Sequence, residues 1–172
     1  MIRVKRFIGN PILSPNPQNS WEKKAAFNPS PVTVGNKTYI LYRAEGIGEK
    51  IGDKVLDLST IGVTESIDKI NFTNRRQLIK NEYDFEKFGC EDPRVTKIDD
   101  KFYIFYTALS KFPPDASSIR VAVAISKDLK TIDEKHLVTP FNAKAMALFP
   151  RKIKGYFAAI LTADTDVLPS KI

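Results

Sequence analysis

Two adjacent carboxylates and an arginine stand immediately before an aromatic-rich stretch, in the sequence GCEDPRVTKIDDKFYIFYTA at residues 89–108. The carboxylates are Glu91 and Asp92, and the arginine is Arg94. A carboxyl group held among hydrogen-bonding partners can donate a proton to a leaving oxygen, as in glycoside cleavage. The same residues also fit a turn in which the acids form ion pairs with Arg94 and only stabilise the strand entrance. The tetrapeptide EDPR alone does not decide between these interpretations.

The sequence around the acid pair is repeated along the chain. The stretch NPSPVTVGNKTYILYRA from Asn28 aligns without a gap with DPRVTKIDDKFYIFYTA from Asp92, which matches Pro29 to Pro93. A third stretch, FPRKIKGYFAAILTA from Phe149, aligns with the second through a shared Pro-Arg dipeptide and needs a two-residue deletion. The alignment predicts that Asn28, Asp92 and Phe149 occupy equivalent strand entrances.

Short apolar runs separated by turn residues predict strands throughout the chain. Residues 38–42, 102–107 and 119–125 cluster β-branched and aromatic side chains, and the runs are too short for helices. Residues 35–36 and 99–100 stand where hairpin turns are expected. The sequence therefore predicts an all-β fold.

A second similarity relates residues 61–72 to residues 121–132 and matches Ser66 to Ser126, so each repeat contains at least four apolar runs. A unit of roughly 60 residues with about four antiparallel strands is typical of a β-propeller blade. Ordinary hairpins that share residue types are the alternative. The repeat favours a partial β-propeller domain over residues 1–172, with blade-like units at about residues 25–85, 86–140 and 141–172, the last of them incomplete.

Polar residues at equivalent strand starts would face one pocket, because the innermost strand of each propeller blade lines a central channel. Asn28 and Asp92 would then converge, with Arg43 at the far end of the first strand and Glu91 and Arg94 beside Asp92. Sugar hydroxyls take paired hydrogen bonds from such groups, and sugar rings pack on aromatic side chains. We therefore expect a carbohydrate site at this pocket.

Composition excludes several other classes of site. The net charge of +7 comes from lysines and arginines scattered along the 172 residues, without the dense basic block of a nucleic-acid-binding arm. No apolar run has the length of a signal peptide or a membrane span. The single cysteine, Cys90, and the single histidine, His136, argue against a metal site and suit a cytoplasmic protein.

Several motifs in order resemble one family of enzymes. They are FNPSP with Asn28, LYRA with Arg43, CEDPRV with Asp92, then YIFYTA, VAVAISKDL, and AKAMALFPRKIKGYF with Lys144. From residue 10 to about residue 163, the chain resembles glycoside hydrolase family 130, which comprises β-mannoside phosphorylases and related hydrolases. The resemblance implies a five-bladed β-propeller, of which this chain contains about the first three blades.

The resemblance also implies a reaction. Members of the family catalyse attack of inorganic phosphate on a β-mannosidic bond with inversion, which releases α-mannose 1-phosphate. Asp92 would be the general acid, acting through a hydroxyl of the bound mannose, and Lys144 would contact phosphate. A single acid suffices because phosphate is already a nucleophile, so the expected co-substrate is phosphate and no cofactor is required.

By the same resemblance, the remaining polar residues of the motifs would hold the substrate. Asn28 and Arg43 would bind the mannose next to the scissile bond, with Glu91 and Arg94 as neighbours. Family members are nearly twice as long as this chain, so the resemblance implies three alternatives: the sequence is part of a longer chain, a second chain completes the propeller, or self-association completes it.

Two departures from the family pattern keep other functions open. Phosphorylases typically carry an arginine where this chain has the sequence Leu161-Thr162-Ala163. In addition, Ala145 stands where a polar residue commonly follows the basic residue that corresponds to Lys144. The alternatives are a β-mannoside hydrolase that uses water and a non-catalytic propeller segment that binds a glycan.

Overall fold

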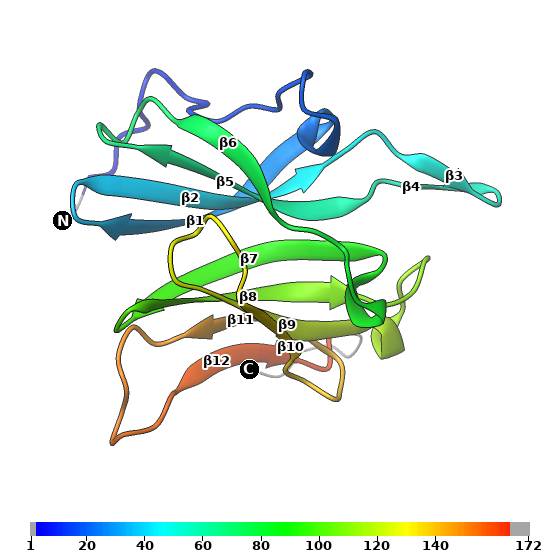
Figure 1. Cartoon of the computed structure of the whole chain (residues 1–172). Helices are drawn as coiled ribbons and strands as arrows, with labels where there is room; N and C mark the ends of the chain where they lie inside the picture. Colours follow the sequence, from blue (N-terminus) through cyan, green and yellow to red (C-terminus); the bar gives the residue numbers. More distant parts are fainter. Residues whose placement is uncertain (1–2, 166–172) are drawn as a thin grey trace.

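A computed structural model describes residues 3–165, and the part that it describes is built from strands with three short 3-10 helices (Figure 1). The prediction of an all-β fold is confirmed. The first sheet has the antiparallel order β1-β2-β5-β6 and the second the order β10-β9-β8-β7. The strands of the two sheets are β1 (Ala25–Val34), β2 (Lys37–Glu45), β5 (Ser59–Ser66), β6 (Thr73–Ile79), β7 (Gly89–Ile98), β8 (Lys101–Leu109), β9 (Ile119–Ser126) and β10 (Glu134–Leu137).

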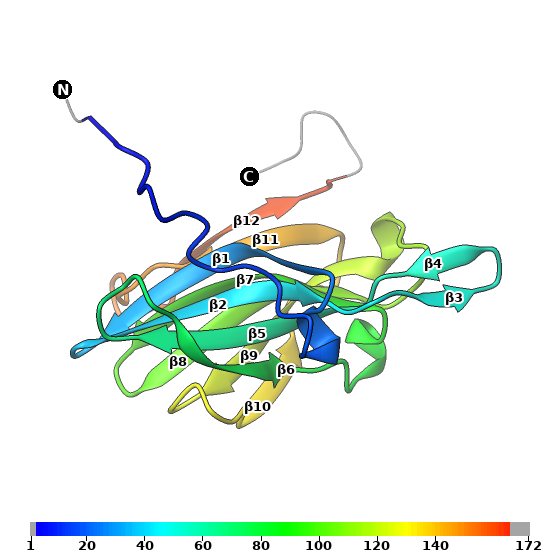
Figure 2. The ribbon, with the colours of Figure 1, turned by 90° about the horizontal axis from the view of Figure 1, so that it is seen from above.

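Two smaller pairs of strands accompany the four-stranded sheets. A hairpin of β3 (Glu49–Ile51) and β4 (Lys54–Leu56) is inserted between β2 and β5 and projects from the body of the molecule (Figures 1 and 2). A ribbon of β11 (Ala143–Leu148) and β12 (Ala159–Ala163) lies beside the second sheet. The 3-10 helices are η1 (Ser20–Glu22), η2 (Asp84–Glu86) and η3 (Ala116–Ser118).

The two sheets repeat the same local structure in register. β1 and β7 have equal lengths, as do β2 and β8, and the third strands of the two sheets, β5 and β9, also match in length. The tight turns fall at the predicted positions, with Gly35 and Asp99 in the left-handed region at φ +59° and +56°. The gapless sequence repeat therefore corresponds to a structural repeat, in which turns and strand lengths match between the two sheets.

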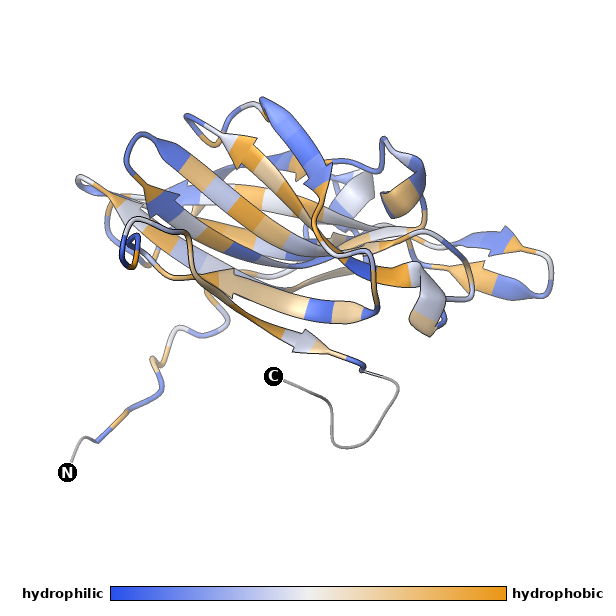
Figure 3. Cartoon of the chain, turned by 90° about the horizontal axis from the view of Figure 1, so that it is seen from below, coloured by the Kyte–Doolittle hydropathy of each residue, from blue (hydrophilic) through white to orange (hydrophobic). Residues whose placement is uncertain are grey.

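Apolar side chains lie between the layers. One cluster, which includes Leu41, Ile61 and Ile104, fills the space between the two sheets. A second, which includes Phe105 and Ala143, fills the space between the second sheet and the ribbon. Figure 3 shows apolar and polar bands alternating along the strands, as expected where one face of a strand is buried. Each fully buried Leu or Ile contributes about 1.5–3 kcal/mol, so these clusters fix how the sheets meet.

A β-bulge interrupts the first strand of each layer near its beginning. The bulges fall between Phe27 and Ser30 in β1 and between Glu91 and Arg94 in β7. The bulged residues Asn28 and Asp92 have φ of +48° and +53°. Asparagine and aspartate tolerate this region better than most residues, and bulges commonly re-aim side chains next to active sites.

The predicted third strand entrance at Phe149 is wrong. In β11 the bulge falls between Lys144 and Met146, and Ala145, at φ +57°, is the residue equivalent to Asn28 and Asp92. Phe149 follows the end of β11. The sequence alignment followed a shared Pro-Arg dipeptide, whereas the bulge is defined by backbone pairing. Lys144 therefore occupies the position of Glu91 in the preceding layer.

Each four-stranded sheet also buries a glutamate at the end of a 3-10 helix. Glu86 is fully buried and accepts hydrogen bonds from Tyr106 Oη at 2.5 Å and from Lys135 Nζ at 2.9 Å. Glu22 is equally buried and accepts from Tyr42 Oη at 2.7 Å and from an arginine of β6, Arg75. Burial is the largest cause that raises the pKa of both phenols far above the ordinary value. Each contact ties a strand of the sheet to the segment that enters it.

Candidate active site

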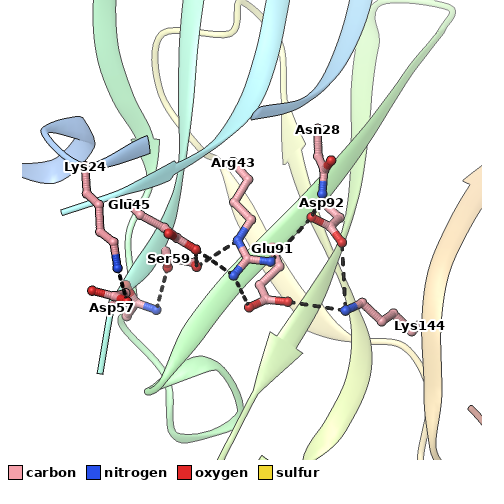
Figure 4. Close-up of polar contacts among 10 residues, drawn as sticks. Lys24, Asn28, Arg43, Glu45, Asp57, Ser59, Glu91, Asp92 and Lys144 are labelled. Atoms are coloured by element: carbon pink, nitrogen blue, oxygen red, sulfur yellow. Dashed lines mark hydrogen bonds and ion pairs between the residues drawn. The ribbon is translucent and has the colours of Figure 1, made fainter. Parts of the chain in front are cut away.

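Side chains from three layers meet where the bulged strands lie side by side, because β7 packs against both β1 and β11. Figure 4 shows Asn28 from β1, Arg43 from β2, Glu91 and Asp92 from β7, and Lys144 from β11 directed toward one another. Two carboxylates, two cations and one amide therefore form a single polar cluster at one end of the strands.

Arg43 bridges the first sheet to the acid pair. Its Nη2 lies 2.8 Å from Glu91 Oε1, and its Nη1 lies 3.7 Å from Asp92 Oδ1. Two neighbours on its own sheet orient the guanidinium, since Nε donates to Ser59 Oγ at 2.9 Å and Nη2 donates to Glu45 Oε1 at 2.8 Å. A guanidinium with partners on several sides is held in one orientation before any ligand arrives.

Asp92 is the carboxylate with the most varied partners. Asn28 Nδ2 donates to Asp92 Oδ1 at 2.5 Å, which joins equivalent bulge positions of two layers. Lys144 Nζ lies 3.9 Å from Asp92 Oδ2 and 3.5 Å from Glu91 Oε2. The Asp92 side chain is 14% exposed and that of Lys144 is 40% exposed, so the open side of the cluster carries a cation beside a carboxyl group.

Glu91 is the more deeply buried of the two acids, with a side chain that is 9% exposed. Burial raises the pKa of its carboxyl group above the ordinary value. Arg43 and Lys144 act in the opposite direction, and the charge of Asp92 raises this pKa further. Glu91 thus links cations from two layers while itself favouring the neutral form more than an exposed glutamate does.

Arg94 is not part of this network. Its Nη1 donates to the carbonyl oxygen of Pro93 at 2.8 Å, and no contact joins Arg94 to either acid within the described residues. The acid pair is therefore not a turn closed by its own arginine. The cations that pair with the two acids are Arg43 of β2 and Lys144 of β11, which are remote in sequence.

This geometry is compatible with acid catalysis on a sugar. A carboxyl group within hydrogen-bonding reach of a bound sugar can act as an acid in the cleavage of a glycosidic bond. Guanidinium, amide and carboxylate groups also bind vicinal hydroxyls, and a half-exposed lysine can attract an anion. The cluster thus combines groups that can bind sugar hydroxyls with two carboxyl groups and a partly exposed cation.

Comparison with known proteins places the chain in a family. The profile of glycoside hydrolase family 130, described as beta-1,4-mannooligosaccharide phosphorylase, matches residues 2–168. The chain belongs to glycoside hydrolase family 130. The fold and the polar cluster are therefore those of a family 130 protein.

Two similar family 130 relatives come from Thermoanaerobacter sp. (strain X514). A beta-1,2-mannobiose phosphorylase is 36% identical over an alignment of 173 positions, which covers 97% of this chain and 57% of the relative. A 1,2-beta-oligomannan phosphorylase is 35% identical over 171 residues, which cover 97% of this chain and 56% of the relative. The chain thus spans somewhat more than half the length of these relatives.

Solved structures show the same fold. The beta-1,2-mannobiose phosphorylase of Listeria innocua, in complex with beta-1,2-mannobiose, matches with a TM-score of 0.72 and 19% identity over 92% of this chain and 58% of that chain. A structure representing family 130 glycoside hydrolases that target beta-1,2 mannosidic linkages in Candida mannan has a TM-score of 0.61 and 26% identity, over 82% of this chain and 45% of that chain. Both structures thus share the architecture of this chain.

The sequence had indicated five of the clustered residues in this family 130 chain, namely Asn28, Arg43, Glu91, Asp92 and Lys144. It had not indicated Glu45 and Ser59, which hold Arg43. Glu45 could have been found, because residues two apart on a strand share a face. Ser59 could not, because its place opposite Glu45 depends on the pairing of β2 with β5 around an inserted hairpin.

A second missed pair lies at the edge of the site. Lys24 forms an ion pair with Asp57, which connects the segment before β1 to the end of the β3–β4 hairpin (Figure 4). Both side chains are partly exposed, so this contact stabilises the structure little. It nevertheless places the hairpin next to the residues that hold Arg43.

Among the residues that the structure describes, no helix is long and apolar enough to cross a membrane.

Proposed function

We propose that this family 130 chain contributes the sugar-cleaving site of a β-mannoside phosphorylase, with Asp92 as the general acid. The observation that carries the proposal is the position of Asp92. It stands at a bulge, accepts a hydrogen bond from Asn28, and forms ion pairs with a cation from each of two other strands. The phosphorylase names of the Thermoanaerobacter relatives support the same reaction class.

In the proposed reaction, the proton of Asp92 reaches the glycosidic oxygen through a hydroxyl of the bound mannose. The bond between that oxygen and the anomeric carbon breaks, and the leaving sugar departs with the proton. A phosphate oxygen forms the new bond to the anomeric carbon from the opposite face. The product is α-mannose 1-phosphate, with inverted configuration, and no second carboxylate is needed to activate a nucleophile.

The other residues bind and orient the reactants in this proposal. Asn28 and Arg43 hold the mannose, and Lys144 faces the incoming phosphate with its half-exposed ammonium group. Glu91 positions both cations through its ion pairs at 2.8 Å and 3.5 Å. Arg94, which lies outside the network, is proposed to contact the more distant part of the substrate.

Hydrolysis is the second candidate function, and one observation favours it. The bulge residue of β11 is Ala145, and the residue opposite Lys144 on β12 is Thr162, so this end of the ribbon, as far as the structure describes it, offers Lys144 as its single cation. A dianion is usually held by several donors. The similarity to hydrolases that target beta-1,2 mannosidic linkages supports the same alternative.

Product analysis separates the two reactions. The purified protein is incubated with β-1,2-mannobiose with and without inorganic phosphate, and sugar phosphates are measured by phosphorus NMR. We expect α-mannose 1-phosphate in amounts that follow the phosphate concentration. Release of two mannose molecules that does not depend on phosphate would instead establish the hydrolase.

We further propose that the two sheets and the ribbon are blades of a five-bladed propeller completed by additional polypeptide or by a second copy. β12 has no second neighbour among the described strands, and several large apolar residues near it are exposed, including Tyr156 and Ile160. An uncovered strand edge with exposed apolar side chains favours association.

A further inference from the structure

The β3–β4 hairpin begins and ends beside the residues that hold Arg43. Glu45 is the last residue of β2, before the hairpin, and Ser59 is the first residue of β5, after it. Both side chains contact the Arg43 guanidinium. The hairpin therefore extends the first sheet beyond the end of the strands at which the polar cluster lies (Figures 1 and 4).

One face of the hairpin lies on the side of the first sheet that faces away from the second sheet. Leu56 and Leu58 line a cavity on that side together with Thr60 and Trp21. In the five-bladed arrangement proposed above, a further blade packs against this side. This face of the hairpin is therefore not free to bind a substrate.

The other face of the hairpin carries Lys50, Val55 and Asp57. Val55 and Asp57 flank Leu56 along the chain, so they point to the side opposite Leu56, and Lys50 is paired directly with Val55. A side-chain carbon added at Gly48 would lie 2.4 Å from Val55 Cγ1 and 2.6 Å from Asp57 Oδ1, which agrees with one shared face. These three residues form the inner hairpin face.

The inner hairpin face is accessible at the edge of the site. Asp57, which forms an ion pair with Lys24, lies beside Glu45 (Figure 4). Val55 is 60% exposed, and Lys50 is exposed and makes no hydrogen bond or ion pair within residues 3–165. A further blade would pack on the other side of the first sheet, so it would not cover these residues.

The proposed reaction determines on which side of the bound mannose the leaving sugar lies. In an inverting displacement, the nucleophile and the leaving group occupy opposite faces of the anomeric carbon. Glu91 contacts Arg43 through Oε1 and Lys144 through Oε2, so the two cations lie on different sides of the acid pair (Figure 4). When phosphate approaches beside Lys144, the leaving sugar lies away from Lys144, on the side of Arg43 and the hairpin.

We infer that the inner hairpin face binds the leaving sugar of a β-mannoside, an inference that rests on the proposed function. Val55 offers an apolar contact to a ring face, and Lys50 and Asp57 offer a donor and an acceptor to hydroxyl groups. Val55 precedes Ser59 by four residues, or about 13 Å along an extended chain, a length comparable with that of a disaccharide. The hairpin thus determines specificity for the leaving group.

Binding measurements separate the two sugar positions. Calorimetric titrations use β-1,2-mannobiose and methyl β-mannoside, which has only a methyl group in place of the leaving sugar. The parent protein for these titrations is Asp92→Asn, which prevents cleavage and keeps a residue that tolerates the positive φ of this position. We expect the parent to bind mannobiose more tightly than methyl β-mannoside, because only mannobiose reaches the inner hairpin face.

Two matched variants of this parent distinguish the faces of the hairpin. Lys50→Met is expected to weaken the binding of mannobiose about three- to tenfold and to leave the binding of methyl β-mannoside unchanged. Lys54→Met removes the same charge from the opposite face, where Lys54 is paired with Ile51, and is expected to change neither affinity. The inference is overturned if Lys50→Met binds mannobiose as tightly as its parent, or if it loses affinity equally for both ligands.

The two proposals fail in different ways. If the wild-type protein forms no α-mannose 1-phosphate while Lys50→Met selectively loses affinity for mannobiose, the proposed function is overturned and the leaving-sugar site stands. If the wild-type protein carries out phosphorolysis while Lys50→Met binds mannobiose like its parent, the leaving-sugar site alone is overturned.

Discussion

Replacing Arg43 by methionine tests whether this residue neutralises the buried acid pair. The substitution keeps an apolar side chain and removes the charge. Glu91 would lose its contact at 2.8 Å and Asp92 its contact at 3.7 Å. Breaking a buried ion pair by removing one partner typically costs about 3–5 kcal/mol, because the other charge is left uncompensated.

Protonation sets an upper limit to this cost for Glu91. Holding an ordinary glutamate, of pKa about 4.3, in its neutral form costs about 1.4 kcal/mol for each pH unit above that pKa. The Glu91 contribution therefore cannot exceed about 3.7 kcal/mol at pH 7 or about 1 kcal/mol at pH 5. Adding about 1 kcal/mol for the lost hydrogen bonds to Ser59 and Glu45, we expect Arg43→Met to lower the free energy of unfolding by about 3–4 kcal/mol at pH 7 and about 1–2 kcal/mol at pH 5.

Urea denaturation at the two pH values measures this difference. Arg94→Met is the matched control, because Arg94 has no contact with either acid in the described structure and its side chain bonds only to a neighbouring carbonyl. We expect this control to change stability by less than about 1 kcal/mol at both pH values. An equal loss for Arg43→Met at pH 5 and pH 7 would refute the reasoning, since the loss would then not arise from an uncompensated carboxylate.

Two further predictions concern buried carboxylates. Glu86→Gln is expected to lower the free energy of unfolding, measured in urea, by about 3–5 kcal/mol. Glu22→Gln is expected to lower it less, because Arg75, the cationic partner of Glu22, is 21% exposed, whereas Lys135, the partner of Glu86, is 3% exposed. Equal losses would contradict this explanation. The raised pKa of Glu91 means that the folded protein binds a proton that the unfolded chain releases, so this contribution is fully present below the ordinary glutamate pKa and is lost as pH rises through the folded value. Between the ordinary glutamate pKa and the raised folded value, the Glu91 contribution to the free energy of unfolding falls as pH rises. Glu91→Gln is expected to make this fall shallower. An unchanged slope would show that Glu91 is not the group responsible.

The sequence predicted most of what depends on local periodicity. A gapless repeat with turn residues at matching positions predicts equal strands and equivalent bulges, so Asn28 and Asp92 could be placed together before their contact was seen. The β11 entrance could not be predicted in the same way, because the spacing from Asp92 to Ala145 differs from that between the first two layers. A bulge is set by strand pairing, and its sequence signal at Ala145 is weak.

The partners of the acid pair also lay beyond the sequence. Arg94 is adjacent to the acids, yet their cations are Arg43 and Lys144. Proximity in sequence favours one pairing, whereas the packing of β7 between two other strands produces another. The buried glutamates had a detectable signal that was overlooked, since the gapless alignment, extended toward the N-terminus, matches the dipeptide Trp21-Glu22 to Phe85-Glu86.

The role of Asp92 is tested most directly by varying the leaving group. Asp92→Asn and the wild-type protein are compared on β-1,2-mannobiose and on an aryl β-mannoside whose phenol needs no protonation to depart. We expect the substitution to reduce cleavage of mannobiose by about 10²–10⁴-fold and to affect the activated aryl mannoside far less. Equal losses on both substrates would contradict the assignment of Asp92 as the proton donor.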